Sequence, residues 1–180
     1  MLEQAGRLRL RLVQQADVGD RYIGWLNDPI VNRFLETRFT IQTADGVRDF
    51  VCKMIDSPAD WLFAMERLDG LAARHIGNLR LGPIRREHAS ASVSLFIGDR
   101  ASWGQGFGTL AISMVRDFAF DRLELERLSA GAYAQNAGSI QAFLAAGFQI
   151  EGRRRGHVRA EQGLRMDVVE MGMLSTDPRP

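Results

Sequence analysis

The sequence predicts one α+β domain with a mixed, mostly antiparallel central sheet of about seven strands and about four helices on its two faces. Short β-prone runs recur along the chain, and turn signals between several of them suit antiparallel neighbours. Four other segments repeat apolar residues at helical spacing. A length of 180 residues allows one sizeable core and is short for two domains.

The N-terminal third alternates a strand with two helices. Leu8, Leu10 and Leu12 alternate with arginines, the period of a half-buried strand. Asp17 is placed to cap a first helix that ends before Pro29, and Thr43 to cap a second one that runs to about residue 55. Residues 30–40 mix charged and aromatic side chains without a period, so we expect an irregular connection there.

The middle third predicts three strands. The runs 61–65 and 76–84 are β-prone and separated by Asp69-Gly70, which favours an antiparallel pair. A polar turn that contains Glu87 and His88 leads into a third run, Ser90 to Ile97. A glycine-rich segment follows this strand directly.

The C-terminal third alternates helices and strands. Apolar residues from 110 to 120 form a wide helical stripe, and a strand is expected over 128–134. A helix over 136–146 stops at Gly147, which suits a left-handed C-terminal position. The last two runs, 148–155 and 164–173, flank Glu161-Gln162-Gly163 and predict a hairpin.

Composition narrows the compartment and the partners. The chain has 23 basic and 22 acidic side chains, so no overall field favours nucleic acid or an anionic membrane. Cys52 is the single cysteine and the N-terminus lacks a secretory pattern, so we expect a cytoplasmic location. We assign residues 1–174 to the domain and expect 175–180 to be a flexible tail.

The glycine-rich segment after the third predicted strand is typical of a phosphate cradle. Gly104, Gly106 and Gly108 let the main chain approach an anion, and the next helix points its free N–H groups at it. No lysine follows, which argues against a nucleotide-triphosphate loop. The pattern G-x-G-x-x-A from Gly106 also fits a dinucleotide-dependent oxidoreductase, but its distance from Ile97 makes this the weaker alternative.

Three motifs in order resemble one family. Trp103-Gly104-Gln105-Gly106-Phe107-Gly108-Thr109 resembles the pyrophosphate loop Q/R-x-x-G-x-G/A of the GNAT superfamily of acyl-CoA-dependent N-acyltransferases, with tryptophan where glutamine or arginine is frequent. The N-x-x-S pattern of Asn136 to Ser139, followed by Gly147-Phe148, is similar to that superfamily's second cofactor segment. Trp25-Leu26-Asn27-Asp28-Pro29 resembles the branch that contains the ribosomal-protein N-terminal acetyltransferases.

The resemblance implies an N-acetyltransferase that uses acetyl-CoA as co-substrate and no metal. It implies a sheet splayed between the fourth and fifth predicted strands, with the pantetheine arm held between them. A primary amine would then attack the thioester directly in a ternary complex. The cofactor-binding residues that this implies are Phe96, Ile97, Trp103, Gly104, Gln105, Gly106, Phe107, Gly108, Thr109, Asn136, Ser139 and Phe143.

The candidate catalytic residues are Ser139, Glu36 and Glu87. Ser139 would protonate the leaving thiolate, because Phe143 occupies the place where many relatives carry a tyrosine. An ordinary helix N-cap by Asn136 is the competing explanation of the N-x-x-S pattern. Relatives often place a glutamate early in the strand that here carries Ser92, so Glu36 and Glu87 stay as alternative bases, with water a possible substitute.

The acceptor stays open at the level of sequence. In the resembled branch, residues 30–40 line the acceptor pocket, which allows a protein N-terminus, an amino sugar or another small amine. Polyamines are less attractive, since no acidic patch is visible. The basic run 153–159 is either solvated edge charge or a grip on an anion. A catalytically silent acyl-CoA-binding or sensing domain is the alternative function, and a homodimer through exposed strands is compatible with the sequence.

Overall fold

The computed structural model describes residues 3–5, 7–69, 72–159 and 163–180. Across these ranges one sheet of eight strands runs in the order β1-β2-β3-β4-β5-β6-β8-β7. The β5 and β6 pair is parallel and the other pairs are antiparallel, which confirms a mixed, mostly antiparallel sheet. The strands are β1 (Glu3–Ala5), β2 (Leu8–Leu12), β3 (Trp61–Asp69), β4 (Ala72–Leu81), β5 (Ser90–Ile97), β6 (Arg127–Tyr133), β7 (Gln149–Arg159) and β8 (Arg165–Leu174).

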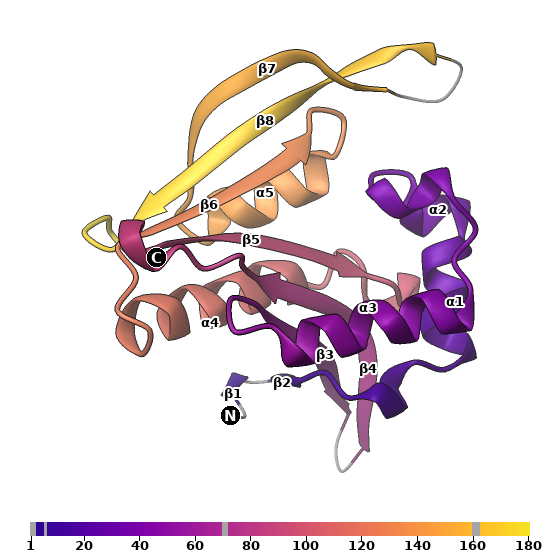
Figure 1. Cartoon of the computed structure of the whole chain (residues 1–180). Coiled ribbons are helices and arrows are strands. Elements are labelled where there is room, and N and C mark those ends of the chain that lie inside the picture. Colours follow the sequence, from indigo (N-terminus) through magenta and orange to yellow (C-terminus); the bar gives the residue numbers. More distant parts are fainter. Residues whose placement is uncertain (1–2, 6, 70–71, 160–162) are drawn as a thin grey trace.

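Helices cover both faces of the sheet (Figure 1), and a hydrophobic cluster lies on each face. Side chains alternate across a strand, so Phe63 packs with α4 and α5 while its neighbour Leu62 packs with α1 and α3. The predicted placement of helices on both faces is therefore confirmed. The helices are α1 (Asp20–Asn27), α2 (Pro29–Asn32), α3 (Ala44–Asp56), α4 (Phe107–Asp121) and α5 (Ala137–Ala145).

The strand count differs from the expectation only at the N-terminus. The additional strand is β1, which has three residues and pairs with β2. Such a short strand carries no period that a sequence pattern can reveal. The predicted splay between the fourth and fifth strands therefore corresponds to β5 and β6 in the labels used below.

Most predicted helix signals have the expected role, and Asp17 does not. The Thr43 hydroxyl accepts a hydrogen bond from the Gly46 N–H at 3.2 Å and caps α3. Gly147 ends α5 with a φ of 98°. Helix α1 instead begins after Gly19, and Asp17 lies in a separate 3-10 turn, η1 (Gln15–Asp17). The carboxylate of Asp17 is engaged by an arginine of β2.

Parts of two predicted turns lie outside the described residues, and the tail forms an ion pair with α4. Gly70 of the Asp69-Gly70 turn and residues 161–162 of the last hairpin turn lie outside the described residues. The tail carries Arg179, whose Nη1 donates to Asp121 Oδ2 at 2.8 Å. The α-helices of the described chain include none that is long and apolar enough to cross a membrane.

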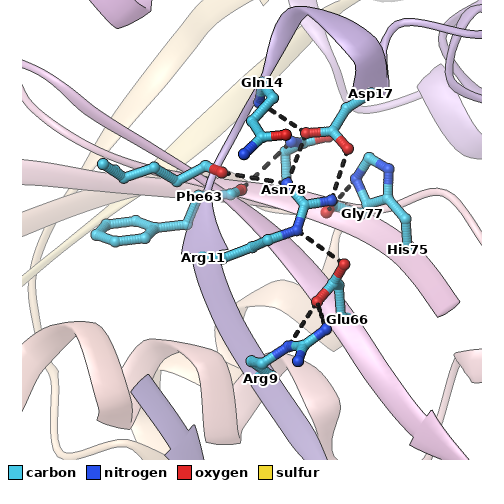
Figure 2. Close-up of polar contacts among 10 residues, drawn as sticks. Arg9, Arg11, Gln14, Asp17, Phe63, Glu66, His75, Gly77 and Asn78 are labelled. Carbon is cyan, nitrogen blue, oxygen red and sulfur yellow. Dashed lines mark hydrogen bonds and ion pairs between the residues drawn. The ribbon is translucent and has the colours of Figure 1, made fainter. Parts of the chain in front are cut away.

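A cluster of partly buried ion pairs attaches η1 to the sheet (Figure 2). Glu66 on β3 accepts from both Arg9 and Arg11, and Arg11 also donates two hydrogen bonds to Asp17, at 2.6 and 2.7 Å. Burial by itself would raise the pKa of the Asp17 carboxyl, but the hydrogen bonds from Arg11 and the Gln14 N–H outweigh it and lower that pKa. The chain entering α1 is therefore anchored by charge as well as by packing.

An aromatic cluster holds α1 against β4 and β5. The ring of His75 meets Trp25 edge-on with centroids 5.2 Å apart, and its Nε2 lies 3.0 Å from the Gly77 carbonyl oxygen. Since a carbonyl only accepts, Nε2 carries the proton. Gly98 faces the same indole so closely that an added Cβ would lie 2.1 Å from Trp25 Cδ2. The position of α1 therefore depends on the absence of a side chain at residue 98.

We predict that Gly98→Ala destabilises the fold by about 1–3 kcal/mol, because the added methyl group forces Trp25 out of its packing. Gly24→Ala in α1 is the matched control, since nothing lies within 4 Å of its added Cβ. Alanine at this helical position should stabilise by about 0.5–1 kcal/mol. Urea unfolding of both variants measures the difference, and equal stabilities would contradict this packing account.

We predict that His75 makes stability pH-dependent below its ordinary pKa. Burial lowers the pKa of His75 below 6.5 in the folded chain, so the folded state binds fewer protons there than the unfolded state. Its contribution is present above 6.5 and is lost as the pH falls below that value. Thermal unfolding between about pH 8 and about pH 5 should show a shallower slope for His75→Gln than for the wild type. Parallel slopes would show that His75 does not titrate on unfolding.

Candidate active site

The site is built on the parting of β5 from β6. These strands pair only at Ser90 with Arg127, Ala91 with Leu128 and Ser92 with Ser129. Within the described ranges no strand pairing continues beyond these three positions, and the two ribbons diverge (Figure 1). The outer edges of both strands are occupied, β5 by β4 and β6 by β8. The diverging inner edges are therefore available for an extended, amide-rich molecule.

The glycine loop lies between the end of β5 and the start of α4. Gly104 and Gly106 have φ values of 70° and 81°, in the left-handed region that favours glycine. An added Cβ at either position would point into open space. No side chain caps Gly106, so the N–H groups of the first turn of α4 remain available, with the positive end of the helix dipole behind them. This is the geometry of a phosphate cradle.

Side chains of the loop maintain its shape. The indole N–H of Trp103 donates to the Ile97 carbonyl at 2.8 Å, so the single donor of this side chain is used within the loop. Gln105 Nε2 donates to the Ala101 carbonyl at 2.5 Å, and Ser102 donates to the buried carboxylate of Asp99 at 2.6 Å. A polar contact from Trp103 to phosphate is therefore not needed to explain this residue.

Two predicted loop residues face inward. The ring of Phe107 is 2% exposed and belongs to the core, so only its backbone faces the cradle side of the loop. Gly108 lies where α4, α5 and β5 meet, and a Cβ there would be 3.6 Å from Ala142 and 3.8 Å from Leu95. The close approach of these elements brings the start of α5 beside the start of α4.

Helix α5 presents Asn136 and Ser139 at its first turn. Asn136 Oδ1 accepts from the Ser139 N–H at 3.2 Å, so Asn136 does act as the helix N-cap. Ser139 is half-buried, and its hydroxyl has no hydrogen-bond partner among the described residues. Phe143, one turn further on, is buried and meets Phe148 edge-on. Capping by Asn136 therefore leaves the serine hydroxyl free for other contacts.

A cavity of about 580 Å³ opens at the parting of the strands. Its walls include residues 94–96 of β5 and 131–133 of β6, together with side chains from α1, α3 and the connection after α2. Five of the predicted site residues line it: Glu36, Phe96, Asn136, Ser139 and Phe143. Ile97 and the loop 103–109 are not part of its lining, and Glu87 is exposed on the 3-10 turn η3 (Arg86–His88), before β5 begins.

Glu36 belongs to a polar cluster that sequence reasoning missed. The Tyr133 hydroxyl donates to Glu36 and accepts from Arg38 Nη1 at 2.8 Å, and Arg38 Nη2 donates to the Arg159 carbonyl at 2.8 Å. Burial, followed by the Glu36 carboxylate, raises the pKa of Tyr133. No sequence pattern links these residues, because Arg38 and Tyr133 are 95 positions apart. Arg38 lies in an irregular connection and Tyr133 at the end of a strand.

Two arginines of the basic run on β7 are paired across its hairpin. Arg153 Nε donates to Asp167 Oδ2 at 2.6 Å, and Arg154 donates to Glu170 on the same neighbouring strand. Both arginines are more than half exposed. These contacts support the interpretation of the run as solvated edge charge.

This combination of a parted parallel strand pair, a glycine cradle after one strand and a capped helix after the other is that of an acyl-CoA-dependent acyltransferase. The acetyltransferase (GNAT) domain family model matches residues 7–149, and the chain belongs to this family. The predicted family and the acyltransferase class are thereby confirmed. The general activity of this family is the acetyl-CoA-dependent transfer of an acetyl group to an amine.

Sequence relatives agree with the family. A probable N-acetyltransferase, YjcK, from Bacillus subtilis (strain 168) is 36% identical over 107 residues, which cover 58% of this chain and 57% of that protein. The match thus spans little more than half of that relative's length. An uncharacterized N-acetyltransferase, p20, from Bacillus licheniformis is 28% identical over 182 residues, covering 95% of this chain and 94% of the relative.

Solved structures share the fold at low identity. Spermidine N-acetyltransferase from Vibrio cholerae in complex with CoA and spermine superposes with a TM-score of 0.83 at 22% identity, covering 95% of this chain and 97% of that one. A GNAT-family acetyltransferase from Bacillus anthracis gives the same TM-score at 17% identity, covering 98% of this chain and 100% of that one. These similarities establish the fold.

We predict that Gly106→Ala weakens acetyl-CoA binding by about tenfold, the equivalent of one lost charge-assisted hydrogen bond. The added methyl group would occupy the open space of the cradle, and a φ of 81° strains any residue other than glycine. Gly152→Ala on β7 is the control, because its added Cβ also meets nothing within 4 Å. Calorimetry with acetyl-CoA measures both, and equal affinities would remove the loop from the binding site.

Proposed function

We propose that this chain transfers the acetyl group of acetyl-CoA to the primary amine of a small molecule by direct attack in a ternary complex. The observation that carries the proposal is the cavity at the strand parting, which joins cofactor-side residues of β5 and α5 to the connection after α2. The thioester supplies the activated acetyl group. The chain supplies the binding sites for both reactants, their orientation and the groups that move protons.

The cofactor side is assigned from the loop to the start of α5. The N–H groups of residues 104–109 would hold the pyrophosphate, and the inner edges at Phe96 and Ile97 would pair with the pantetheine amides. Asn136 and Ser139 stand on the wall beyond, with Phe143 as an apolar surface. The residues assigned to the cofactor thus lead from the phosphate cradle toward the cavity.

Ser139 is our proposed proton donor to the leaving thiolate. Its half-buried hydroxyl lines the cavity, and its backbone N–H is fixed by the cap of Asn136. A proton delivered to sulfur balances the proton that the attacking amine loses. Tyr133 lines the same cavity, but its hydroxyl donates to Glu36, so it is the less suitable donor.

Glu36 is our proposed proton acceptor, acting directly or through water. Its side chain is 70% exposed and lines the cavity, so water can carry its proton away. Glu87 is the weaker candidate of the two carboxylates, because it stands outside the cavity lining.

The acceptor is a small amine in this proposal, in keeping with the cavity volume of about 580 Å³. The finer resemblance to the ribosomal-protein branch rests on Trp25-Leu26-Asn27-Asp28-Pro29, and each polar member has a local structural role. Asn27 Nδ2 donates to the Gln42 carbonyl, and Asp28 accepts from the Ile30 N–H to cap α2. This motif thus orders the connection after α1 whatever the acceptor is.

We predict that Ser139→Ala lowers kcat by about 100-fold and leaves acetyl-CoA affinity within about twofold, because a positioned acid acts only in the chemical step. Gln141→Ala, an exposed position on the same helix, is the control and should keep both values. Steady-state thiol release and calorimetry provide the two readouts.

Unchanged kcat in Ser139→Ala would exclude Ser139 as the acid. A wild-type chain that binds acetyl-CoA yet releases no thiol with any amine would favour the catalytically silent binding or sensing domain instead.

A further inference from the structure

Two buried polar atoms in the described part of the chain lack a hydrogen-bond partner, and both belong to residues that line the cavity. They are Thr37 Oγ1, on the 3-10 turn η2 (Glu36–Phe39), and Asn78 Oδ1, on β4. A buried polar atom without a partner is costly, so native structures keep few of them. Both atoms carry almost no exposed surface, so a ligand that completes them must displace neighbouring side chains as it enters the cavity.

Asn78 is oriented as a fixed hydrogen-bond acceptor. The residue is 2% exposed, and its Nδ2 donates to the Phe63 carbonyl at 3.3 Å. Because a carbonyl only accepts, this bond places nitrogen toward Phe63 and leaves Oδ1 unpaired. The His75 ring is a polar neighbour whose charged form Asn78 favours, but no hydrogen bond joins the two side chains. Asn78 also pairs with Phe96 of β5, next to the strand parting. The partner that this oxygen lacks is an N–H or O–H donor.

The charges of the cavity lining do not suit a molecule with several ammonium groups. Glu36 is its one acidic lining residue in the described chain, and this carboxylate already accepts from Tyr133. Arg80 is its one basic lining residue, and Asp60, at 2.6 Å, neutralises it. A second ammonium would therefore enter the cavity without a carboxylate partner.

The remainder of the lining on the acceptor side is apolar apart from Gln42, whose Nε2 is bonded to the Thr37 and Thr40 carbonyls. It is contributed by α1, α3, β3 and the segment between α2 and η2, through Tyr22, Leu26, Phe34, Leu35, Val47 and Leu62. Burial of a hydrocarbon or aromatic body against these side chains is favourable in proportion to the apolar area removed from water. The cavity therefore combines one amine-binding end with an apolar wall.

We propose that the acceptor is a monoamine with an apolar body, and that Asn78 and Thr37 determine this specificity by binding its polar end. The inference rests on the proposed function. The amine nitrogen forms a bond to the acetyl carbon, the carbon–sulfur bond breaks, and the nitrogen loses one proton while the thiolate gains one. The N–H that the product amide retains is the one that Asn78 Oδ1 accepts.

An acceptor panel tests the substrate class. We expect kcat/KM for 2-phenylethylamine to exceed that for spermidine and for putrescine by at least about tenfold. The reason is that its ring is buried against the apolar wall and that it carries no second ammonium group. A preference for spermidine or putrescine, or equal values, would overturn the inference. Calorimetry with acetyl-CoA alone distinguishes a failure of this inference from a failure of the proposed function. A chain that does not bind acetyl-CoA contradicts the proposed function, whereas a chain that binds it and prefers spermidine or putrescine contradicts only the acceptor class.

Variants test the two residues. Asn78→Leu removes the acceptor oxygen at similar volume and should raise KM for 2-phenylethylamine about tenfold, with acetyl-CoA affinity unchanged. Thr37→Val should raise the same KM several-fold and also raise the melting temperature by about 2 °C, because an unpaired buried hydroxyl is removed. Thr40→Val is the control: Thr40 is not a lining residue of the cavity, and its partner Gln42 stays bonded to the Thr37 and Thr40 carbonyls, so KM should not change.

The Thr37 result keeps the proposal testable even if Asn78→Leu does not fold. Its hydroxyl makes no bond that the fold needs, so Thr37→Val should fold in any case. An unchanged KM in Thr37→Val, or the same KM increase in Thr40→Val, would overturn the assignment. A rise in melting temperature without a change in KM would identify Thr37 as a packing defect and would also overturn it.

Discussion

The parting of β5 from β6 is the constraint on which the rest of the structure depends. Three parallel residue pairs join the strands, and the next residues have their hydrogen-bonding edges turned toward a widening space. The glycine cradle follows the end of one strand and the capped helix α5 follows the end of the other. Each strand therefore positions one part of the site. The separation of the glycine cradle from the start of α5 depends on the residue at which β5 and β6 stop pairing.

The acceptor side is held by a different set of forces. Partly buried charges fix η1 to β2 and β3, and the edge-on contact of Trp25 with His75 fixes α1 to the sheet. The close approach of Gly98 to that indole lets the helix lie against the end of β5. Donor and acceptor walls are thus supported separately, one by backbone geometry and the other by side-chain contacts.

Polar groups are well paired in this support, whereas two polar atoms of cavity-lining residues are unpaired. Glu66 and Asp17 each accept more than one hydrogen bond, whereas Thr37 Oγ1 and Asn78 Oδ1 accept none from the described chain. Proteins violate local rules of hydrogen-bond satisfaction mostly at functional sites. Both unsatisfied atoms therefore belong to the residues around the cavity and neither to the support.

The sequence by itself determined the features that depend on neighbouring residues. Alternation and helical spacing specify the strands and most helices, Thr43 and Gly147 mark helix ends, and the glycine loop with its N-x-x-S partner indicates the acyl-CoA side. Only the tertiary structure decided the partners of side chains far apart in the chain. Asp17 meets Arg11 instead of capping α1, and Tyr133 reaches Glu36. Such pairings, and the cavity they surround, depend on how strands and helices pack, which no local period encodes.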